Sequence, residues 1–578
     1  MRITLPLRAA TGLVGLGLLS HGAAAQFGPE PFTNGGVLPT VGTNSANSDL
    51  RLQLEPYFSP PAPLSRQPAL IISPSLGVDL GVTDNARRVA SPRQADVFTL
   101  ISPSIALSAD TSRLRVNLNY SPTISIYANQ SSQNQIVQSG AGQALATIVP
   151  NAVFLDVRGS ITEESLTGNG INSTVTSYNA QNAVQTITVS ITPYAEHRFG
   201  GYGTARVGYS FARTLQDQVN GNNTLQQNNF NNTFNPALVG TPAYGAIGNL
   251  TTQRERASFV TGEDLGRIND SVVAEAFQYS GGGTSYTGAY RNQVSNEFGY
   301  AVTRIITALA GIGYQNIRYG GNPNIRIDEP SYNFGGRYTP NPDTTVTVLY
   351  GRRDAISSIS FDGTAAPTAR TRLIGRYSTG LTTDIEEAQN VLSTTSVGPT
   401  GLLTDTATGA PVGSGSSFGV QNGVYKLRRL SATGLLLQDR DSYSVGIVME
   451  DRTTITNTPS ILGGIVIPAG TGSNSFYVNA SWQHDLAPDL STVLSGQYGT
   501  TNNTSQFVTG QGGNQRTLSI TGALNKQFTE TLSGSVRYTF TNQSSTSSTA
   551  FNQLNARAGL NTGSYTENVL LVGLRKSF

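Results

Sequence analysis

Cysteine is absent from this 578-residue chain, and histidine, methionine and tryptophan occur only three times, twice and once. The absence of cysteine excludes disulfide bonds, thiolate metal sites and cysteine nucleophiles. Beyond residue 25 the histidines are His197 and His484, which are far apart in the chain and have no second metal ligand at close spacing. We therefore expect no metal site, no cofactor and no enzymatic activity.

Charge and long hydrophobic runs are also scarce. Charged residues make up 12% of the chain, about half of the roughly 25% that is usual in soluble domains. Hydrophobic residues make up 37% and the mean hydropathy is −0.18, which excludes a bundle of membrane-spanning helices. The small charge is balanced, because 35 basic residues face 35 acidic ones once Arg2 and Arg8 are set aside. This balance predicts no nucleic-acid partner.

The N-terminus has the pattern of a secretory signal peptide. Arg2 and Arg8 supply positive charge, Ala9–Ser20 is a short apolar segment, and Ala23 and Ala25 flank a small-residue cleavage site. We predict a signal peptide over residues 1–25. Residues 26–67 are rich in proline and glycine without any period, which predicts a periplasmic linker. The main domain is then 68–578.

Alternating polar and apolar residues dominate that domain. In Arg113–Tyr127, for example, Leu114, Val116 and Leu118 alternate with arginine and asparagine. Such segments are about 10 to 15 residues long, and a strand of a membrane barrel needs about 9–11. A soluble sandwich also alternates, but this sequence shows no helices to cover a sheet, and its polar faces suit a water-filled lumen.

Short and long connections alternate along the chain. The short ones are Asp110–Ser112, Pro150-Asn151, Gly200-Gly201, Arg267–Asp270, Arg304, Pro340–Asp343, Ala365–Thr368, Asp439–Asp441, Ala487–Asp489 and Thr529-Glu530. The long ones include Ser165–Asn182, Gln216–Thr251, Thr383–Tyr425, Asp451–Asn474, Thr501–Asn514 and Ser544–Glu567, with a tight exception at Arg352-Arg353. Bacterial outer-membrane barrels have short periplasmic turns and longer outer loops.

These patterns predict an all-β fold, a transmembrane antiparallel up-and-down outer-membrane β-barrel of about 22 strands, in a range of 20–24. Phe551–Leu560 also alternates, but a strand there would break the rhythm, so we place it in the last loop. The closing strand is Asn568–Phe578, in which Leu570, Val572, Leu574 and the terminal Phe578 share one face. We expect deletion of Phe578 to impair assembly.

Several stretches, taken in order, resemble a family of outer-membrane barrels. They are 70–85, 98–110, 113–128, 149–161, 346–354, 370–384 and 565–578. The chain resembles the β-barrel porins associated with exosortase (PEP-CTERM) and exopolysaccharide gene clusters. It departs from their pattern at Lys576, where an aromatic or apolar residue is usual, and at Arg304-Ile305, where a proline-containing turn is expected. The resemblance implies a barrel with a link to polysaccharide export.

The candidate functional residues are arginines on the polar faces of the strands. They are Arg113, Arg115, Arg158, Arg206, Arg337, Arg353, Arg370, Arg372, Arg376 and Arg537, with Asp156 and, if its segment is a strand, Arg557. Arginines that line a wet pore favour anions. The alternative is that they pair with acidic residues and stiffen the wall.

Two further features concern the loops. Thr383–Leu392 is predicted to be a short helix, either a constriction inside the lumen or a surface lid. The acidic pairs Glu163-Glu164, Glu263-Asp264, Asp328-Glu329 and Glu386-Glu387 are interpreted as solvated. Neighbouring residues of a strand point to opposite faces, which does not suit paired acid–base catalysis.

The leading interpretation is a porin-like channel in the outer membrane of a Gram-negative cell, serving exopolysaccharide export or the passage of anionic solutes. Two alternatives remain: a structural or adhesive surface barrel with a closed lumen, and, less favoured, a barrel enzyme. The expected partners are outer-membrane lipid and lipopolysaccharide, the barrel-assembly machinery, and polysaccharide or small anions.

Overall fold

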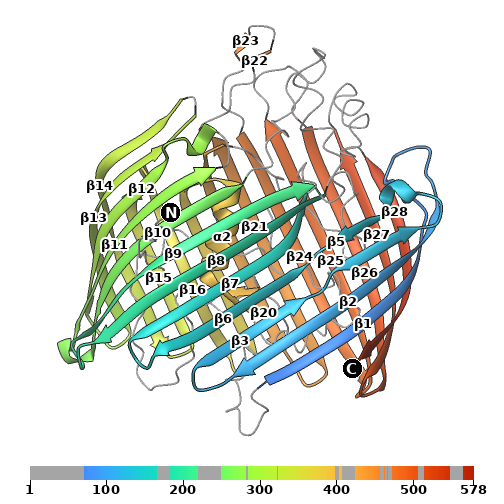
Figure 1. Ribbon diagram of the computed structural model, residues 1–578, viewed down its shortest axis with the longest axis horizontal. Coiled ribbons are helices and arrows are strands. Elements are labelled where there is room, and N and C mark those ends of the chain that lie inside the picture. The colour runs from blue at the N-terminus through green and yellow to red at the C-terminus, as the bar shows by residue number, and fades with distance from the viewer. Residues whose placement is uncertain are drawn as a thin grey trace, which may run out of the picture.

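The computed structural model is a closed antiparallel barrel of 22 strands (Figure 1). It describes residues 70–165, 183–218, 249–281, 284–321, 323–397, 403–405, 423–455, 461–462, 465–466, 472–504, 513–546 and 564–578. The predicted fold class and strand number are confirmed. The predicted signal peptide, the linker and the segment Phe551–Leu560 lie outside the described residues.

The barrel strands follow one another in chain order. They are β1 (Leu70–Thr83), β2 (Asp96–Asp110), β3 (Leu114–Tyr120), β4 (Thr123–Tyr127), β5 (Gln135–Val137), β6 (Gly140–Val149), β7 (Val153–Ser165), β8 (Ala183–Arg198), β9 (Gly203–Gln218), β10 (Leu250–Thr261), β11 (Ile268–Gly281), β12 (Tyr290–Ala301), β13 (Ile306–Tyr319), β14 (Ile325–Asn341), β15 (Thr344–Arg353), β16 (Ile356–Thr368), β17 (Thr371–Thr382), β20 (Tyr425–Leu437), β21 (Asp441–Thr454), β24 (Gly472–Ala487), β25 (Leu490–Thr504), β26 (Gly513–Thr529), β27 (Leu532–Ser545) and β28 (Tyr565–Ser577).

Shorter elements accompany the barrel. They are α2 (Asp384–Thr394), the 3-10 turns η2 (Ser131–Gln133), η5 (Glu263–Leu265) and η6 (Thr284–Tyr286), and the small hairpins β18 (Thr395–Val397) with β19 (Leu403–Asp405) and β22 (Ile461–Leu462) with β23 (Ile465–Val466). Among the described residues, no helix combines the length and apolar character that crossing a membrane requires.

Two of the 22 strands are interrupted, because β3 with β4 and β5 with β6 each occupy one position in the ring. Pro122 separates β3 from β4. Proline has no N–H to donate to a neighbouring strand, so it breaks the hydrogen-bond ladder. Beside it, the backbone N–H of Ser121 donates to the carbonyl of Ser139 at 2.8 Å. This bond keeps β3 and β4 in line.

The first and last strands close the ring. β1 pairs with β28 from Ser75–Ser577 to Thr83–Val569 in unbroken register. The backbone N–H of Phe578 donates to the carbonyl of Pro74 at 3.0 Å. A closed ring leaves no strand edge unpaired, which is the condition for a sheet to exist in lipid.

The two faces of the barrel have opposite chemistry. Large apolar side chains are exposed on the outside, as at Val572 and Leu574 of β28, which are 52% and 55% exposed, and Leu570 and Phe578 are exposed in the same way. Small polar side chains face inward and are buried, as at Thr517 and Ser519 of β26. An apolar outer surface around a closed barrel places the chain in the outer membrane.

Some predicted turns are shifted in the structure. The turn predicted at Arg267–Asp270 is formed by residues 262–267, and β11 begins at Ile268. The segment Ala365–Thr368 belongs to β16, where the register shifts before Thr368. The tight outer turn predicted at Arg352-Arg353 lies one step later, at Asp354 and Ala355, which both have positive φ (52° and 59°). Local alternation continues through these residues, so the sequence pattern alone does not mark the turn.

Candidate functional site

The helix α2 lies inside the barrel, behind β8 and β9 in the view of Figure 1. This agrees with the predicted helix over Thr383–Leu392, and of its two alternative placements the structure shows the one inside the lumen. Thr383 caps its N-terminus, since the Thr383 hydroxyl accepts from the backbone N–H of Glu386 at 3.2 Å. Ile385 and Leu392 are 4% and 1% exposed, so the helix is packed on more than one side.

Arginines of β20 and β21 hold the first turn of α2. Arg452 donates to Asp384 at 2.7 Å, to Glu387 at 3.4 Å and to Glu450 at 2.6 Å. Arg429 contacts Glu387 at 3.3 Å and Glu450 at 2.9 Å. All five side chains are buried. Charged groups that are buried together in this way hold one another in place, because each carboxylate needs a counterion in a poorly solvated site.

Burial raises the pKa of Glu387 to about 6, against the opposing effect of Arg429 and Arg452. Burial also raises the pKa of Glu386. The helix therefore carries carboxyl groups that take up protons more readily than exposed ones. The interpretation of Glu386-Glu387 as solvated is wrong, because both side chains are buried (6% and 7% exposed). An acidic pair in a loop is usually solvated, and only the arginines of distant strands reverse this.

Aromatic residues of the inner wall cover a second side of the helix. Ile385 belongs to a buried apolar cluster with Tyr279, Tyr286 and Tyr319 from β11, η6 and β13. The hydroxyl of Tyr319 donates to Glu386 at 3.0 Å, and Tyr286 is hydrogen-bonded to Thr383. These contacts attach the start of α2 to the β11–β13 wall.

The far end of α2 reaches the opposite wall. Arg158 of β7 donates to the carbonyl of Leu392 at 3.3 Å, and Gln389 donates to the carbonyl of Leu250 at 3.3 Å. The helix also packs against β8 and β9. In the ring of strands, β7 and β8 lie across from β20 and β21. The helix therefore spans the lumen from one wall to the other.

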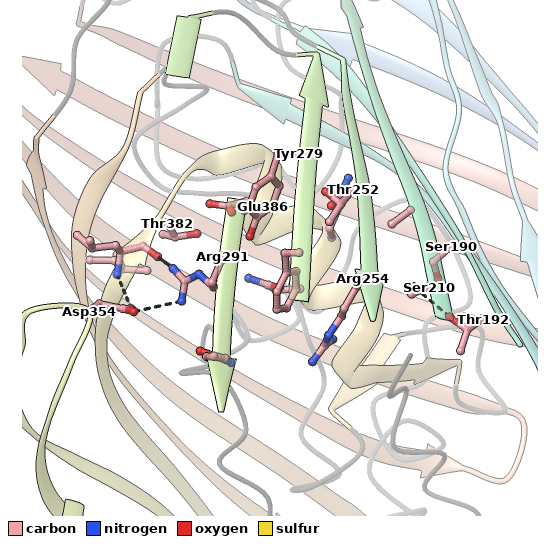
Figure 2. A pocket seen from close by; sticks show the side chains of 18 of the residues that line it. Ser190, Thr192, Ser210, Thr252, Arg254, Tyr279, Arg291, Asp354, Thr382 and Glu386 are labelled. Carbon is pink, nitrogen blue, oxygen red and sulfur yellow. Dashed lines mark hydrogen bonds and ion pairs between the residues drawn. The ribbon is translucent and has the colours of Figure 1, made fainter. Parts of the chain in front are cut away.

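A chamber of about 1080 Å³, which includes space open to solvent, lies beside α2. Figure 2 shows Thr252 and Arg254 between Tyr279 and Arg291 on one side and Ser190, Thr192 and Ser210 on the other. Its lining combines guanidinium, carboxylate, hydroxyl and amide groups with the rings of Phe277 and Tyr279, the carboxylates being Asp156, Asp354 and Glu386. Such a lining suits polar, hydroxylated solutes.

The arginines predicted from the sequence are distributed around the barrel wall and in its periplasmic turns. Arg113 and Arg370 lie in the turns after β2 and β16, not on a strand. Six of the set form ion pairs: Arg115–Asp110, Arg158–Asp156, Arg206–Glu196, Arg370–Asp439, Arg372–Asp343 and Arg376–Asp362. Arg337 donates to Thr347 at 3.2 Å, Arg353 contacts Gln293 at 3.4 Å, and Arg537 is buried. The ion pairs support wall stiffening for the five of these arginines that lie on strands, whereas the Arg370–Asp439 pair is exposed in a turn. Arg557 lies outside the described residues.

Sequence reasoning missed the arginines that bind α2 or line the chamber, which are Arg254, Arg291, Arg429 and Arg452. The strand β20 shows why, because its inward face begins with Tyr425 and Leu427 while Arg428 is exposed outside. Alternation alone assigns tyrosine and leucine to the lipid side. Here they face inward because α2 covers them.

The geometry defines the class of the protein, an outer-membrane β-barrel with a helix across its lumen. No family model and no curated protein matches the chain. The chain is similar to solved structures that include the siderophore receptor PirA from Pseudomonas aeruginosa (12% identity, 89% of this chain and 81% of that chain, TM-score 0.38). Others are the FrpB iron transporter from Neisseria meningitidis (9%, 93% and 86%, TM-score 0.46) and OccK2 from P. aeruginosa (8%, 88% and 98%, TM-score 0.30). At these identities the likeness concerns the barrel architecture and not function.

Proposed function

We propose that the barrel is a channel for polar solutes, constricted by α2 and lined beside it by arginine and hydroxyl groups. The observation that carries this proposal is the chamber, which Arg254 and Arg291 line together with Ser190, Thr192 and Thr252. Charged and hydroxyl groups on the wall of a wet pore replace part of the water that surrounds a solute. The resemblance to exopolysaccharide-associated barrels supports an acidic or hydroxylated polymer as the solute.

A structural barrel with a closed lumen is the second candidate, and one observation favours it. The helix is tied to β7, β20 and β21 by buried polar contacts, which oppose its displacement. The two candidates differ in whether ions pass when α2 is docked.

Conductance in planar bilayers separates them. We expect the purified protein to give discrete conductance steps. In a KCl gradient, we expect the sign of the reversal potential to show selectivity for anions. The comparison is a variant in which a glycine–serine linker of equal length replaces residues 384–394. Steps that appear only in this variant support the closed barrel, and a reversal potential on the cation side contradicts the anion preference.

The link to export needs a separate test in cells. If the protein exports a polysaccharide, a strain that lacks it retains the polymer in the periplasm, and the parent chain restores secretion. Undiminished secretion without the protein contradicts the export proposal and leaves the channel proposal standing.

A further inference from the structure

The arginines that line the chamber differ in how many of their N–H donors are hydrogen-bonded to the protein. Arg158 makes three hydrogen bonds to Asp156, at 2.8 to 3.1 Å. Arg291 donates to Asp354 at 3.2 Å, to the Tyr319 hydroxyl at 3.3 Å and to the carbonyl of Leu381 at 3.2 Å. The donors of these two guanidinium groups are directed at the protein itself.

Arg254 differs from these two arginines. Among the described residues, its guanidinium donates through one nitrogen, which binds Glu275. That carboxylate also forms an ion pair with Arg256 at 3.0 Å and accepts from Gln293 at 2.6 Å. Within the described part of the chain, its Nε has no hydrogen-bond partner. A guanidinium has five N–H donors, so Arg254 retains most of its capacity while it shares its counterion.

A second polar group without a hydrogen-bond partner lies on the same face of β10. Thr252 is 6% exposed, and its hydroxyl has no hydrogen-bond partner among the described residues. Thr252 and Arg254 both line the chamber, and Figure 2 shows them one above the other on β10. A buried polar group without a partner costs about 1–3 kcal/mol, so a ligand that supplies the missing partner gains that amount in return.

An aromatic surface adjoins the pair. Arg254 stacks over the ring of Phe277 at 4.8 Å, and Phe277 stacks with Tyr279 at 6.1 Å between centroids. Both rings line the chamber. A planar guanidinium over an aromatic ring stays oriented and can bind a carboxylate through two parallel hydrogen bonds. Ser210 lies beside Arg254 on the neighbouring strand β9, and Ser190 lies one strand further on β8, so their hydroxyl groups continue the polar wall next to the pair.

We infer that Arg254 and Thr252 form a binding subsite for the carboxylate of a hydroxylated solute, of the kind an acidic sugar provides. Arg254 binds the carboxylate, Thr252 donates its hydroxyl to it, and the Phe277–Tyr279 surface receives the ring of the solute. This inference rests on the proposed channel function, because the solute must enter the lumen to reach the chamber.

Calorimetry on the purified full-length barrel in detergent tests the subsite without requiring ion flow. The probes are glucuronate, glucose and succinate. We expect glucuronate to bind more tightly than glucose, and also more tightly than succinate, which has carboxylates but no ring. Equal binding of glucuronate and glucose overturns the inference, and equal binding of glucuronate and succinate overturns the role of the ring.

Substitutions locate the site. We expect Arg254→Met to weaken glucuronate binding at least about tenfold, and Arg254→Lys to weaken it less, because lysine keeps the charge and loses the fork. Thr252→Val keeps the shape and removes the hydroxyl, so it tests the site even if Arg254→Met fails to fold. Arg428→Met is the matched control, since Arg428 is exposed on the outer face of β20.

The outcomes separate the two proposals. Unchanged glucuronate affinity in Arg254→Met and Thr252→Val overturns the subsite, whatever the conductance. Conductance with no glucuronate binding leaves the channel and removes the subsite. Tight, Arg254-dependent binding with no conductance through the parent protein keeps the subsite and points to the closed barrel.

Discussion

The wall that faces α2 and the wall formed by β24, β25 and β26 share one outer surface but present different chemistry to the lumen. On the α2 side, buried arginines and carboxylates alternate, as at Arg429, Glu450 and Arg452. In the described residues of β24, β25 and β26, every buried polar side chain is serine, threonine or glutamine. Both faces are polar, yet only one carries buried charge.

The difference between the two walls indicates the structural role of the buried charged groups. Hydroxyl pairs such as Ser444–Ser481 at 2.6 Å and Thr521–Thr539 at 2.9 Å join neighbouring strands. The charged pairs also reach a segment outside the sheet, since Arg452 contacts Asp384 and Glu387 of α2. Hydroxyl groups on the inner wall hydrogen-bond to one another across neighbouring strands, whereas the ion pairs attach the inserted helix α2 to the wall.

The largest expected effect comes from removing Arg452. Arg452→Leu leaves Asp384, Glu387 and Glu450 close together with one arginine fewer, and breaking a buried ion pair costs about 3–5 kcal/mol. The matched change on the neutral wall is Gln483→Leu, which removes one buried amide at about 1–3 kcal/mol. Denaturant unfolding in detergent, followed by the heat-modifiable mobility of the barrel, measures both. Equal losses would mean that the two walls do not differ as described.

A second test uses pH. In the docked helix the pKa of Glu387 is about 6, against an ordinary value of 4.5 for an exposed glutamate. The docked state therefore binds the proton more tightly, so docking strengthens as pH falls through about 6 and has its full advantage below about 4.5. If α2 constricts the path, we expect conductance to be several-fold lower at pH 5 than at pH 7.5.

The control for this prediction is a pair of variants. Glu387→Gln should reduce the pH dependence, because it deletes one of the two carboxyl groups of α2 whose pKa burial raises. Glu263→Gln, in an exposed periplasmic turn, should leave it intact. A pH dependence that is undiminished in Glu387→Gln assigns the titration to another group, such as Glu386.

The smallest effect is expected on the neutral wall. Ser519→Ala removes one hydroxyl of the Ser519–Thr541 contact at 3.3 Å, and a neutral hydrogen bond contributes about 0.5–1.5 kcal/mol. We expect the loss in unfolding free energy to be within that range and the conductance to be unchanged. A large change in conductance would show that this wall, and not the chamber beside α2, limits passage.

The barrel itself could be predicted because its signals are local. Alternation within each strand, the rhythm of short and long connections and the closing strand Asn568–Phe578 each depend on neighbouring residues. The predicted outward residues Leu570, Val572 and Leu574 are exposed in the structure. Turn positions were less well predicted, because alternation runs on through Arg352-Arg353 to Asp354.

The candidate site depended on contacts between distant parts of the chain. The sequence by itself determined the class of fold, the approximate strand number and the existence of a short helix near Thr383–Leu392. Only the tertiary structure decided that this helix crosses the lumen, that Glu387 is buried against Arg452, 65 residues away, and that Arg254 shares its carboxylate with Arg256. The reason is physical: a strand's periodicity is set by its own residues, whereas the partners of a buried charge are set by which strands the closed ring places across from one another.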